Sequence, residues 1–387
     1  MRKWCGAILF VLLLMSFSVS GEDREVVELS IRKEGEHAIS KGLEWLLSEQ
    51  MDDGSWSSYP AITALVVSSY LRSPFWYDQY NTPAVARGLD YIVNCAKSDG
   101  SIYTDNMPGY NTSVCLMTLI DAGEESYSEI IKRAREYLIQ LQCDEGEGYQ
   151  PDSIFYGGIG YGGDDRPDLS NLQWALEALK KSEDHAKRSE YSLRQIDDSE
   201  PADNLPTEGL SGKGIFWDKA ILFLERCQNL NGVNNQSWAG DDGGFVYYPG
   251  YSKAGGTTSY GSMTYAGLKS FIYANVDKKD PRIRSAFEWI RSNYTVDKNP
   301  ELGLQGLYYY YHTMAKALNV YGEDKIQDDE GVVHNWREDL VIKLCTIQHE
   351  EGYWVNTNGR WWEHNRALVT AYCILALEEV LDCKIRP

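Results

Sequence analysis

Four side chains in this 387-residue sequence combine reactive chemistry with a place at or near the start of a predicted helix: Asp168, Tyr260, Tyr309 and His312. A carboxyl group and an imidazole can both transfer protons, and a histidine titrates near neutral pH. Each tyrosine joins a flat apolar face to a polar hydroxyl. We therefore take the four as candidate catalytic groups. The alternative for Asp168 is that it only caps its helix.

Further polar and aromatic residues occupy the starts of the same predicted helices. Tyr and Trp suit an isoprenoid, a carbocation, a sugar or a peptide, because each offers an apolar face with a polar edge. At helical spacing, however, such aromatic residues also pack into a core. The candidate lining of a binding site comprises Asn111, Asn171, Ser262, Thr264, Tyr308, Tyr310, Trp361, Trp362, His364, Asn365 and Arg366.

A repeated turn separates the elements that must position these residues. The segments 50–56 and 348–354 share the spacing Gln-x-x-x-Gly-x-Trp, and partial copies follow Gln142 and Gln228. A Gln at a helix C-terminus can hydrogen-bond to the backbone that follows. Gly54 and Gly352 suit the positive-φ position after a helix. The Trp is then expected to pack over the hairpin.

A second predicted helix follows each turn, and its apolar residues recur at a spacing near 3.6, as in buried helices. No strand or hairpin pattern is evident. The segment 180–212 is rich in Ser, Glu, Asp and Lys and is expected to be a charged excursion. The sequence thus predicts an all-α protein of about six helical hairpins. Its second helices begin near Pro60, Asn111, Asp168, Ser259, Leu307 and His364.

The segment 41–56 resembles the QW motif of squalene-hopene and oxidosqualene cyclases, terpene cyclases whose repeats protein prenyltransferase β subunits share more loosely. The resemblance covers nearly all of residues 21–387. It implies one α/α toroid, in which the second helices form an inner ring whose N-termini open toward a central funnel. Complement-like thioester domains and some carbohydrate-active proteins share this toroid, so the resemblance indicates a fold more strongly than an activity.

The catalytic patterns of the resembling families are incomplete in this chain. Cyclases begin an inner helix with Asp-x-Asp-Asp, whose middle Asp protonates an alkene or epoxide. Here the later acids are replaced by Ser170 and Asn171, and neither has the acidity required. Prenyltransferases hold zinc with Asp, Cys and His. The segment around His312 resembles the one with their His, but the Asp-x-Cys position reads Tyr260-Gly261-Ser262.

Cofactor patterns also lack their required context. A lone His312 is a poor zinc site, since catalytic zinc usually has three protein ligands. The run 164–168 matches the Asp-Asp-x-x-Asp of magnesium-diphosphate sites, but Pro167 disfavours the helix that such a motif needs. Residues 158–163 fit Gly-x-Gly-x-x-Gly, yet no strand precedes them. We therefore predict no cofactor, with zinc and magnesium both disfavoured.

The N-terminus predicts export. Arg2 and Lys3 precede an apolar run over 5–19, and small residues precede Gly21, which together are typical of a signal peptide over 1–20. The protein is then secreted or periplasmic, without a transmembrane segment after cleavage. A net charge of −20 argues against nucleic acid as a partner. The cysteines lie mostly in apolar helical runs, which favours buried thiols over disulfides.

Two hypotheses for function remain open. In the first, the protein acts on or binds an apolar or isoprenoid-like ligand in the funnel. In the second, it is a non-catalytic binding or scaffold module for a peptide, a glycan or a partner protein. The missing acids and zinc ligands favour the second, and the family resemblance favours the first. Whether the chain is an enzyme, and its oligomeric state, stay open.

Overall fold

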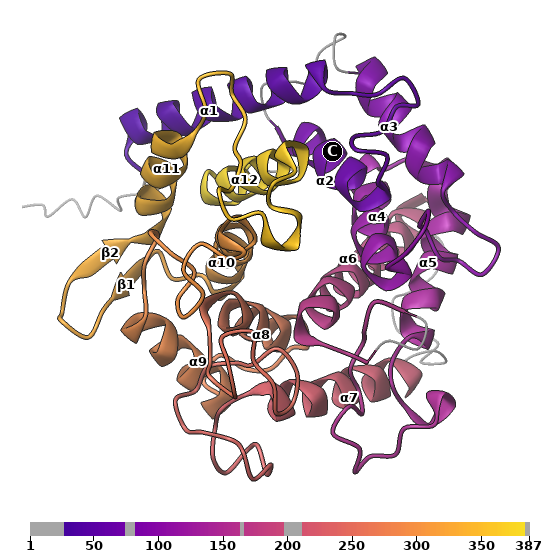
Figure 1. The fold of residues 1–387 in the computed structure, drawn as a ribbon. Helices are drawn as coiled ribbons and strands as arrows, with labels where there is room; N and C mark the ends of the chain where they lie inside the picture. Colours follow the sequence, from indigo (N-terminus) through magenta and orange to yellow (C-terminus); the bar gives the residue numbers. More distant parts are fainter. Residues whose placement is uncertain (1–26, 74–81, 163–165, 197–210, 384–387) are drawn as a thin grey trace, which may run out of the picture.

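Helices alternate between two concentric rings in the computed structural model, which describes residues 27–73, 82–162, 166–196 and 211–383 (Figure 1). The outer ring contains α1 (Leu29–Ser48), α3 (Thr82–Asn94), α5 (Ser128–Gln140), α7 (Ser211–Cys227), α9 (Pro281–Ser292) and α11 (Trp336–Ile347). The inner ring contains α2 (Pro60–Arg72), α4 (Pro108–Ala122), α6 (Leu169–Ile196), α8 (Gly261–Tyr273), α10 (Leu307–Tyr321) and α12 (Arg366–Val380). The predicted alternation of six outer and six inner helices is confirmed.

The inner ring is closed. Each inner helix packs against the next one, and α12 returns to α2. The first outer helix, α1, packs against α11 and α12, so the two ends of the described chain meet. The predicted fold class, an all-α α/α toroid, is confirmed.

The two rings differ in how their helices are buried. In α2, every residue from Pro60 to Tyr70 is buried, because neighbouring helices cover it on most sides. In α9, only Ile283, Ala286, Trp289 and Ile290 are buried, which is the single apolar stripe of a surface helix. This contrast in apolar patterning places each helix in its ring.

The repeated turns join one hairpin to the next. Gln50 Nε2 donates to Gly54 O at 2.9 Å and to Ala84 O of the next outer helix at 2.8 Å. Gln348 makes the same pair of bonds, to Gly352 O and to Ala38 O in α1, and thereby helps to close the ring. The turn glycines are required: each has a positive φ and lies against a backbone carbonyl that a Cβ would strike.

The tryptophans of these turns pack as predicted. Trp56 is fully buried, and its Nε1 donates to Leu46 O at 2.7 Å. Trp354 is also fully buried and donates to Leu344 O at 2.9 Å. Each indole therefore binds the end of the outer helix that precedes its turn.

The structure corrects two details of the prediction. Strands β1 (Lys325–Gln327) and β2 (Val333–Asn335) form an antiparallel hairpin, whereas no strand was expected. The Asp328 carboxylate stabilises its turn by accepting bonds from the amides of Glu330 and Val332. Secondly, α6 continues to Ile196, so much of the expected excursion is helical. Its Glu, Lys, Arg and Ala content favours a helix.

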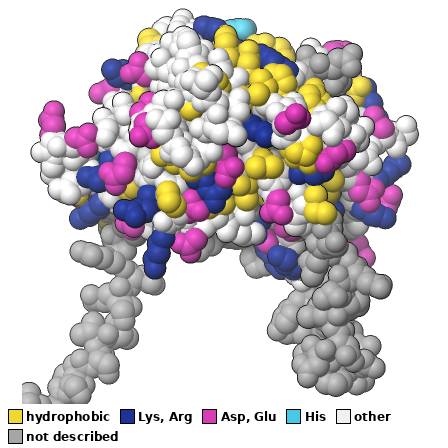
Figure 2. All heavy atoms as spheres, turned by 90° about the horizontal axis from the view of Figure 1, so that it is seen from below, with side chains coloured by type: hydrophobic (Ala, Val, Ile, Leu, Met, Phe, Trp, Pro, Cys, Tyr) yellow, Lys and Arg dark blue, Asp and Glu magenta, His cyan; other side chains and the backbone are white. Residues whose placement is uncertain are grey.

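The remaining 3₁₀ turns are η1 (Glu125–Tyr127), η2 (Glu145–Glu147) and η3 (Arg360–Trp362). The predicted signal peptide and residues 197–210 of the expected excursion lie outside the described residues. Within the described ranges, no helix is both long enough and apolar enough to span a bilayer. Acidic, basic and hydrophobic side chains are interspersed over the face in Figure 2.

The cysteines that the structure describes are free thiols. Four of them, Cys115, Cys143, Cys227 and Cys373, are buried. Burial raises the pKa of the Cys115 and Cys227 thiols well above the ordinary value. These groups are therefore protonated packing residues.

Candidate functional site

A cavity of about 230 Å³ lies where the N-terminal halves of the six inner helices converge. Every inner helix contributes to it, because all six point their first turns toward the same end of the ring. The lining residues from these helices are Ile62, Tyr110, Ser170, Asn171, Trp174, Ser262, Met263, Tyr309, Leu368 and Tyr372. The connecting segments add Tyr59, Met107, Tyr161, Tyr247, Lys253, Tyr260, Gly306, Trp361, Trp362 and Glu363.

Aromatic rings dominate this lining, and they pack on one another. Tyr110 lies edge-on to Trp174 with centroids 5.9 Å apart, and Tyr309 lies edge-on to Tyr372 at 6.2 Å. Their polar atoms are occupied: the hydroxyls of Tyr110 and Tyr372 are 3.3 Å apart, and Tyr309 accepts from Gln173. Burial raises the pKa of each of these phenols, which keeps them neutral. These three side chains thus offer the cavity ring faces together with hydroxyls that already take part in hydrogen bonds within the protein.

Two tryptophans at the cavity mouth adopt a backbone conformation that bulky residues rarely take. Trp361 has φ 55° and Trp362 has φ 67°. Such left-handed residues cost on the order of 1–3 kcal/mol each. They are nevertheless 40% and 43% exposed, with only partial packing: Trp362 lies edge-on to Tyr59 at 4.9 Å. Strain held at a ligand-sized opening is a feature of functional sites.

Asp168 lies behind the wall instead of in it. Its Oδ1 accepts from Asn171 N at 3.0 Å and from Ser170 Oγ at 2.6 Å, and its Oδ2 accepts from Asn171 Nδ2 at 2.9 Å. This is the geometry of an N-cap on α6. Burial raises the pKa of Asp168. Ser170 and Asn171, which bond to it, line the cavity, whereas Asp168 is not part of the lining.

His312 is enclosed below the cavity wall. Its ring stacks on Trp174 and tilts against Tyr372, with both centroids 5.2 Å away. Neither ring nitrogen has a hydrogen-bond partner among the described residues. Burial, with Lys316 and Lys269 nearby, lowers the pKa of His312 well below its ordinary value, so the ring is neutral. It touches the cavity only through the aromatic rings that cover it.

Six of the other residues predicted to be at the site line the cavity: Tyr260, Tyr309, Asn171, Ser262, Trp361 and Trp362. The rest lie outside the lining and have local structural partners. The hydroxyl of Thr264 accepts from Phe245 N at 3.1 Å, Tyr308 and Tyr310 donate their hydroxyls to backbone carbonyls, and Asn111 Nδ2 donates to Tyr59 Oη.

The last three predicted residues stand where α12 begins. Asn365 caps this helix by accepting from Leu368 N at 3.0 Å. Arg366 lies 4.4 Å over the ring of Tyr353, and His364 is exposed beside Gly359 O. Some polar residues at helix starts therefore cap their helix and others line the cavity. The spacing of the residues in the sequence does not distinguish the two roles.

Glu363 is a site residue that the sequence did not reveal. It is 1% exposed and lines the cavity. Its Oε1 accepts from the amides of Tyr308 and Tyr309 at 3.0 and 2.8 Å, and its Oε2 accepts from Asn356 Nδ2 at 2.5 Å. Burial outweighs these bonds and raises the pKa of Glu363 to about 7. The sequence pattern that could have identified Glu363 is an acidic residue just before an inner helix, which is the pattern that identified Asp168.

Among the described residues, no group of three His, Cys, Asp or Glu side chains is placed to hold a metal ion. Asp164 and Asp165 of the Asp-Asp-x-x-Asp run lie outside the described residues. Of the four candidate catalytic residues, Asp168 belongs to a helix cap and His312 to the packed layer under the cavity, whereas Tyr260 and Tyr309 line the cavity.

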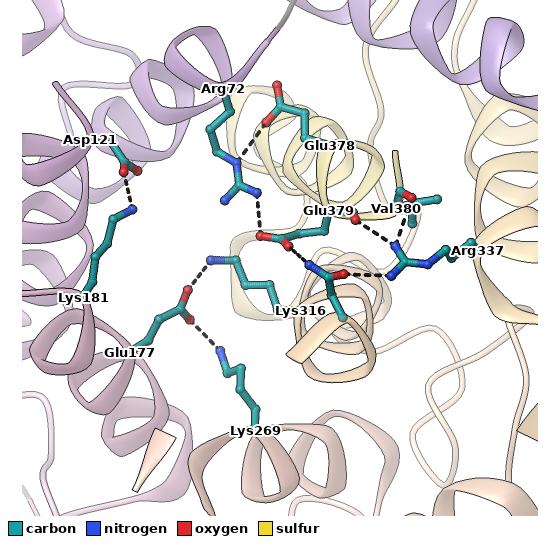
Figure 3. A network of polar contacts seen from close by, with 11 residues as sticks. Arg72, Asp121, Glu177, Lys181, Lys269, Lys316, Arg337, Glu378, Glu379 and Val380 are labelled. Carbon is teal, nitrogen blue, oxygen red and sulfur yellow. Dashed lines mark hydrogen bonds and ion pairs between the residues drawn. The ribbon is translucent and has the colours of Figure 1, made fainter. Parts of the chain in front are cut away.

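An ionic belt occupies the opposite end of the inner ring, and all six inner helices contribute to it (Figure 3). Glu177 Oε2 is 2.7 Å from Lys269 Nζ, and its Oε1 bonds to Lys316. Arg72 binds Glu379 at 2.7 Å, and Lys181 pairs with Asp121. The belt comprises Arg72, Asp121, Glu177, Lys181, Lys269, Lys316, Glu378 and Glu379.

No family model matches the chain. Solved structures with this architecture include both terpene cyclases and glycosidases. One similar structure is a variant of the type II terpene cyclase MstE from Scytonema in complex with geranylgeranyl dihydroxybenzoate. It superposes with a TM-score of 0.55 at 13% sequence identity, and the alignment covers 92% of this chain and 99% of that chain. A glycosidase variant in complex with glucose gives 0.50 at 11% identity, covering 92% and 100%. A possible member of the GH105 family from Salmonella enterica subsp. enterica serovar Paratyphi A gives 0.52 at 9%, covering 91% and 94%. These likenesses show a terpene cyclase-like α/α toroid.

Proposed function

We propose that the protein binds an apolar, isoprenoid-like molecule in its central cavity. The observation that carries this proposal is the wall of ring faces, in which the hydroxyls of Tyr110, Tyr309 and Tyr372 take part in hydrogen bonds within the protein. A concave, mostly apolar site with a few polar groups is what small apolar ligands require. The terpene cyclase-like fold supports the same class of ligand.

A sugar fits this wall less well. Hydrolysis of a glycosidic bond needs two carboxyl groups facing the scissile bond. In the described lining, Glu363 is the single acidic residue, and Asp168 is held behind the wall by its cap bonds. A glycan would also need many hydrogen-bond partners, whereas half of the lining residues are aromatic and several others are aliphatic or Met. We therefore favour an isoprenoid-like ligand.

The same groups support binding more than proton-initiated conversion. A carboxyl group with a pKa of about 7, as Glu363 has, is a weaker acid than an ordinary glutamic acid and is poorly suited to protonating an alkene. While it keeps its proton, Glu363 can instead donate a hydrogen bond to a ligand oxygen. Its place in the wall would then orient a polar group of the ligand.

Equilibrium dialysis with radiolabelled farnesol tests the proposal. We expect saturable binding at one site per chain. Tyr309→Ala should weaken that binding about tenfold, because it removes one ring of the wall. Tyr127→Ala, which changes a tyrosine of η1 outside the lining, is the matched control, and thermal melts establish that each variant is folded.

Two results would overturn this function. One is farnesol bound no better than to an unrelated acidic protein. The other is unchanged affinity in Tyr309→Ala. Extraction of the bound ligand after prolonged incubation tests the preference for binding over conversion. We expect intact farnesol, and a cyclised product would contradict that part of the proposal.

A further inference from the structure

We propose that the mouth of the cavity contains a binding site for a negatively charged head group, formed by Lys253 with Arg166 and Arg360. The ligand would then be an amphiphile: an anionic head, such as a carboxylate or a phosphate, joined to the isoprenoid-like tail. This inference rests on the proposed function, because the tail must occupy the aromatic cavity.

The three cations have aromatic and amide neighbours but no carboxylate partner among the described residues. Lys253 Nζ lies 4.3 Å from the centroid of the Tyr247 ring, and Arg166 lies 4.0 Å from that of Tyr248. Arg360 lies 4.6 Å over Trp361 and donates to the side-chain amide of Gln305.

Some cations elsewhere in the molecule are paired with carboxylates, whereas others, such as Lys97 and Arg366, lie over tyrosine rings. Lys219 pairs with Asp144 and Glu145, and Arg282 pairs with Glu225 and Asp280. In a chain with a net charge of −20, carboxylates are abundant. What distinguishes Lys253, Arg166 and Arg360 is their place: the three gather at the mouth of an apolar cavity without a carboxylate partner among the described residues, where an external anion would serve as their counterion.

The three positive groups act on one another. Lys253 lines the cavity and is half-buried. Burial lowers its pKa, and both Arg166 and Arg360 lower it further, while the Asp168 carboxyl opposes them. Asp168 forms no ion pair with the lysine, because its two oxygens bond to the cap of α6. The second carboxyl nearby, Glu363, is likewise bonded to the start of α10. Among the described residues, three cations thus face two carboxyl groups, which leaves an excess of positive charge at the site.

An aromatic shelf holds two of these cations without neutralising them. Tyr248 and Tyr251 stack with centroids 4.7 Å apart, and Tyr247 adjoins Tyr248 at 5.9 Å. A cation over a ring face is positioned by attraction to the π-electrons and keeps its N–H groups for another acceptor. Tyr247 is also part of the cavity wall, so the shelf places the positive charge directly beside the space for the tail.

Matched probes that share one tail separate the head-group site from the cavity. The probes are farnesol, farnesoic acid and farnesyl phosphate, with inorganic phosphate offered alone as a fourth. At low salt, we expect the two anionic probes to bind at least about tenfold more tightly than farnesol, because a hydrogen bond to a charged group contributes that much. Added salt should reduce this advantage, since the mouth is open to solvent.

Lys253→Gln should remove most of the advantage of the anionic probes. The advantage is measured as the ratio of the anionic-probe affinity to the farnesol affinity in the same variant, so that any change in the cavity common to both probes cancels. Combination with Arg166→Gln should remove the remainder. The control is Lys97→Gln, because Lys97 also lies over a tyrosine ring, at 3.4 Å from the Tyr103 centroid, but outside the cavity lining. Thermal melts report whether each variant is folded.

Several outcomes would overturn the proposal. They are equal affinity for all three farnesyl probes, an anionic preference that survives in the double variant, or inorganic phosphate bound as tightly as farnesyl phosphate. Failure of the proposed function looks different. If anionic probes bind in a Lys253-dependent manner while farnesol does not bind at all, the head-group site stands and the apolar cavity does not. If no probe binds, both proposals are wrong.

Discussion

Removing one charge from the ionic belt should destabilise the whole ring. Glu177 is 8% exposed and is the carboxylate shared by Lys269 and Lys316, the first of which is fully buried. Glu177→Gln keeps the shape of the side chain but leaves two buried ammonium groups without their counterion. Breaking a buried ion pair in this way costs about 3–5 kcal/mol.

This cost converts to a measurable change in melting temperature. Unfolding entropies of about 2.1 cal/mol/K per residue give roughly 0.8 kcal/mol/K for a chain of 387 residues. The melting temperature at pH 7 should therefore fall by about 4–6 °C in differential scanning calorimetry. Replacing all three partners by apolar residues, as in Glu177→Leu with Lys269→Met and Lys316→Met, should recover much of the loss.

The pH dependence of this effect has a fixed sign. Burial alone would raise the pKa of Glu177, but the two lysines hold it well below the ordinary value of 4.5. Its contribution to stability is therefore complete above pH 4.5 and is lost as the pH falls further. The difference between wild type and Glu177→Gln should shrink below pH 4.5.

Glu129→Gln is the control, because Glu129 is exposed and lies 3.7 Å from Arg133 on the surface of α5. It should change stability by less than about 1 kcal/mol. Equal melting temperatures for Glu177→Gln and this control would refute the reasoning. A deficit that persisted undiminished at pH 3 would refute it equally.

Three further outcomes are expected. Trp56→Ala should destabilise the protein by about 3–5 kcal/mol in chemical denaturation, without weakening farnesol binding to the folded fraction, because the buried indole lies in a turn away from the cavity. Gly157→Ala should abolish soluble expression, since the added Cβ would lie 1.8 Å from Lys219 O. Its control is Gly148→Ala: Gly148 has φ 83° but no atom within 4 Å of the added Cβ, so the free energy of unfolding should fall by only about 1–2 kcal/mol. Glu363→Gln should make stability depend less on pH. The pKa of Glu363 is raised from 4.5 to about 7, so wild type should lose stability relative to the variant as the pH rises from 4.5 to 7, as measured in thermal melts.

The ring was predictable from sequence because the inner helices are apolar on most sides and are bounded by residues that stop helices. Their expected starts fall within three residues of the observed ones, at Pro60, Pro108, Leu169, Gly261, Leu307 and Arg366. The β1–β2 hairpin was missed because strands of three residues are too short to display an alternating pattern. The helical extension of α6 was missed because a polar composition also suits a solvated helix.

The candidate site was only partly predictable. Tyr260 and Tyr309 were found because they stand at inner-helix starts, which the ring brings together. Lys253 and Tyr247 belong to the long connection between α7 and α8, whose path depends on contacts distant in sequence. Trp174 lies more than one turn into α6, where an aromatic residue cannot be distinguished from core. Pairs such as Glu177 with Lys316 depend on how neighbouring inner helices align.

The bond from Gln348 to Ala38 limits how this architecture can vary. An open solenoid lengthens by adding a repeat, and it needs special capping repeats at its ends. Here the last outer helix supplies the partner of the first, so no hairpin is terminal, and an added or deleted hairpin would change the curvature of every interface. Variation in length is therefore confined to the connections. The longest fully described one, between α7 and α8, contributes Tyr247 and Lys253 to the cavity, so changes there can alter ligand recognition while the ring stays intact.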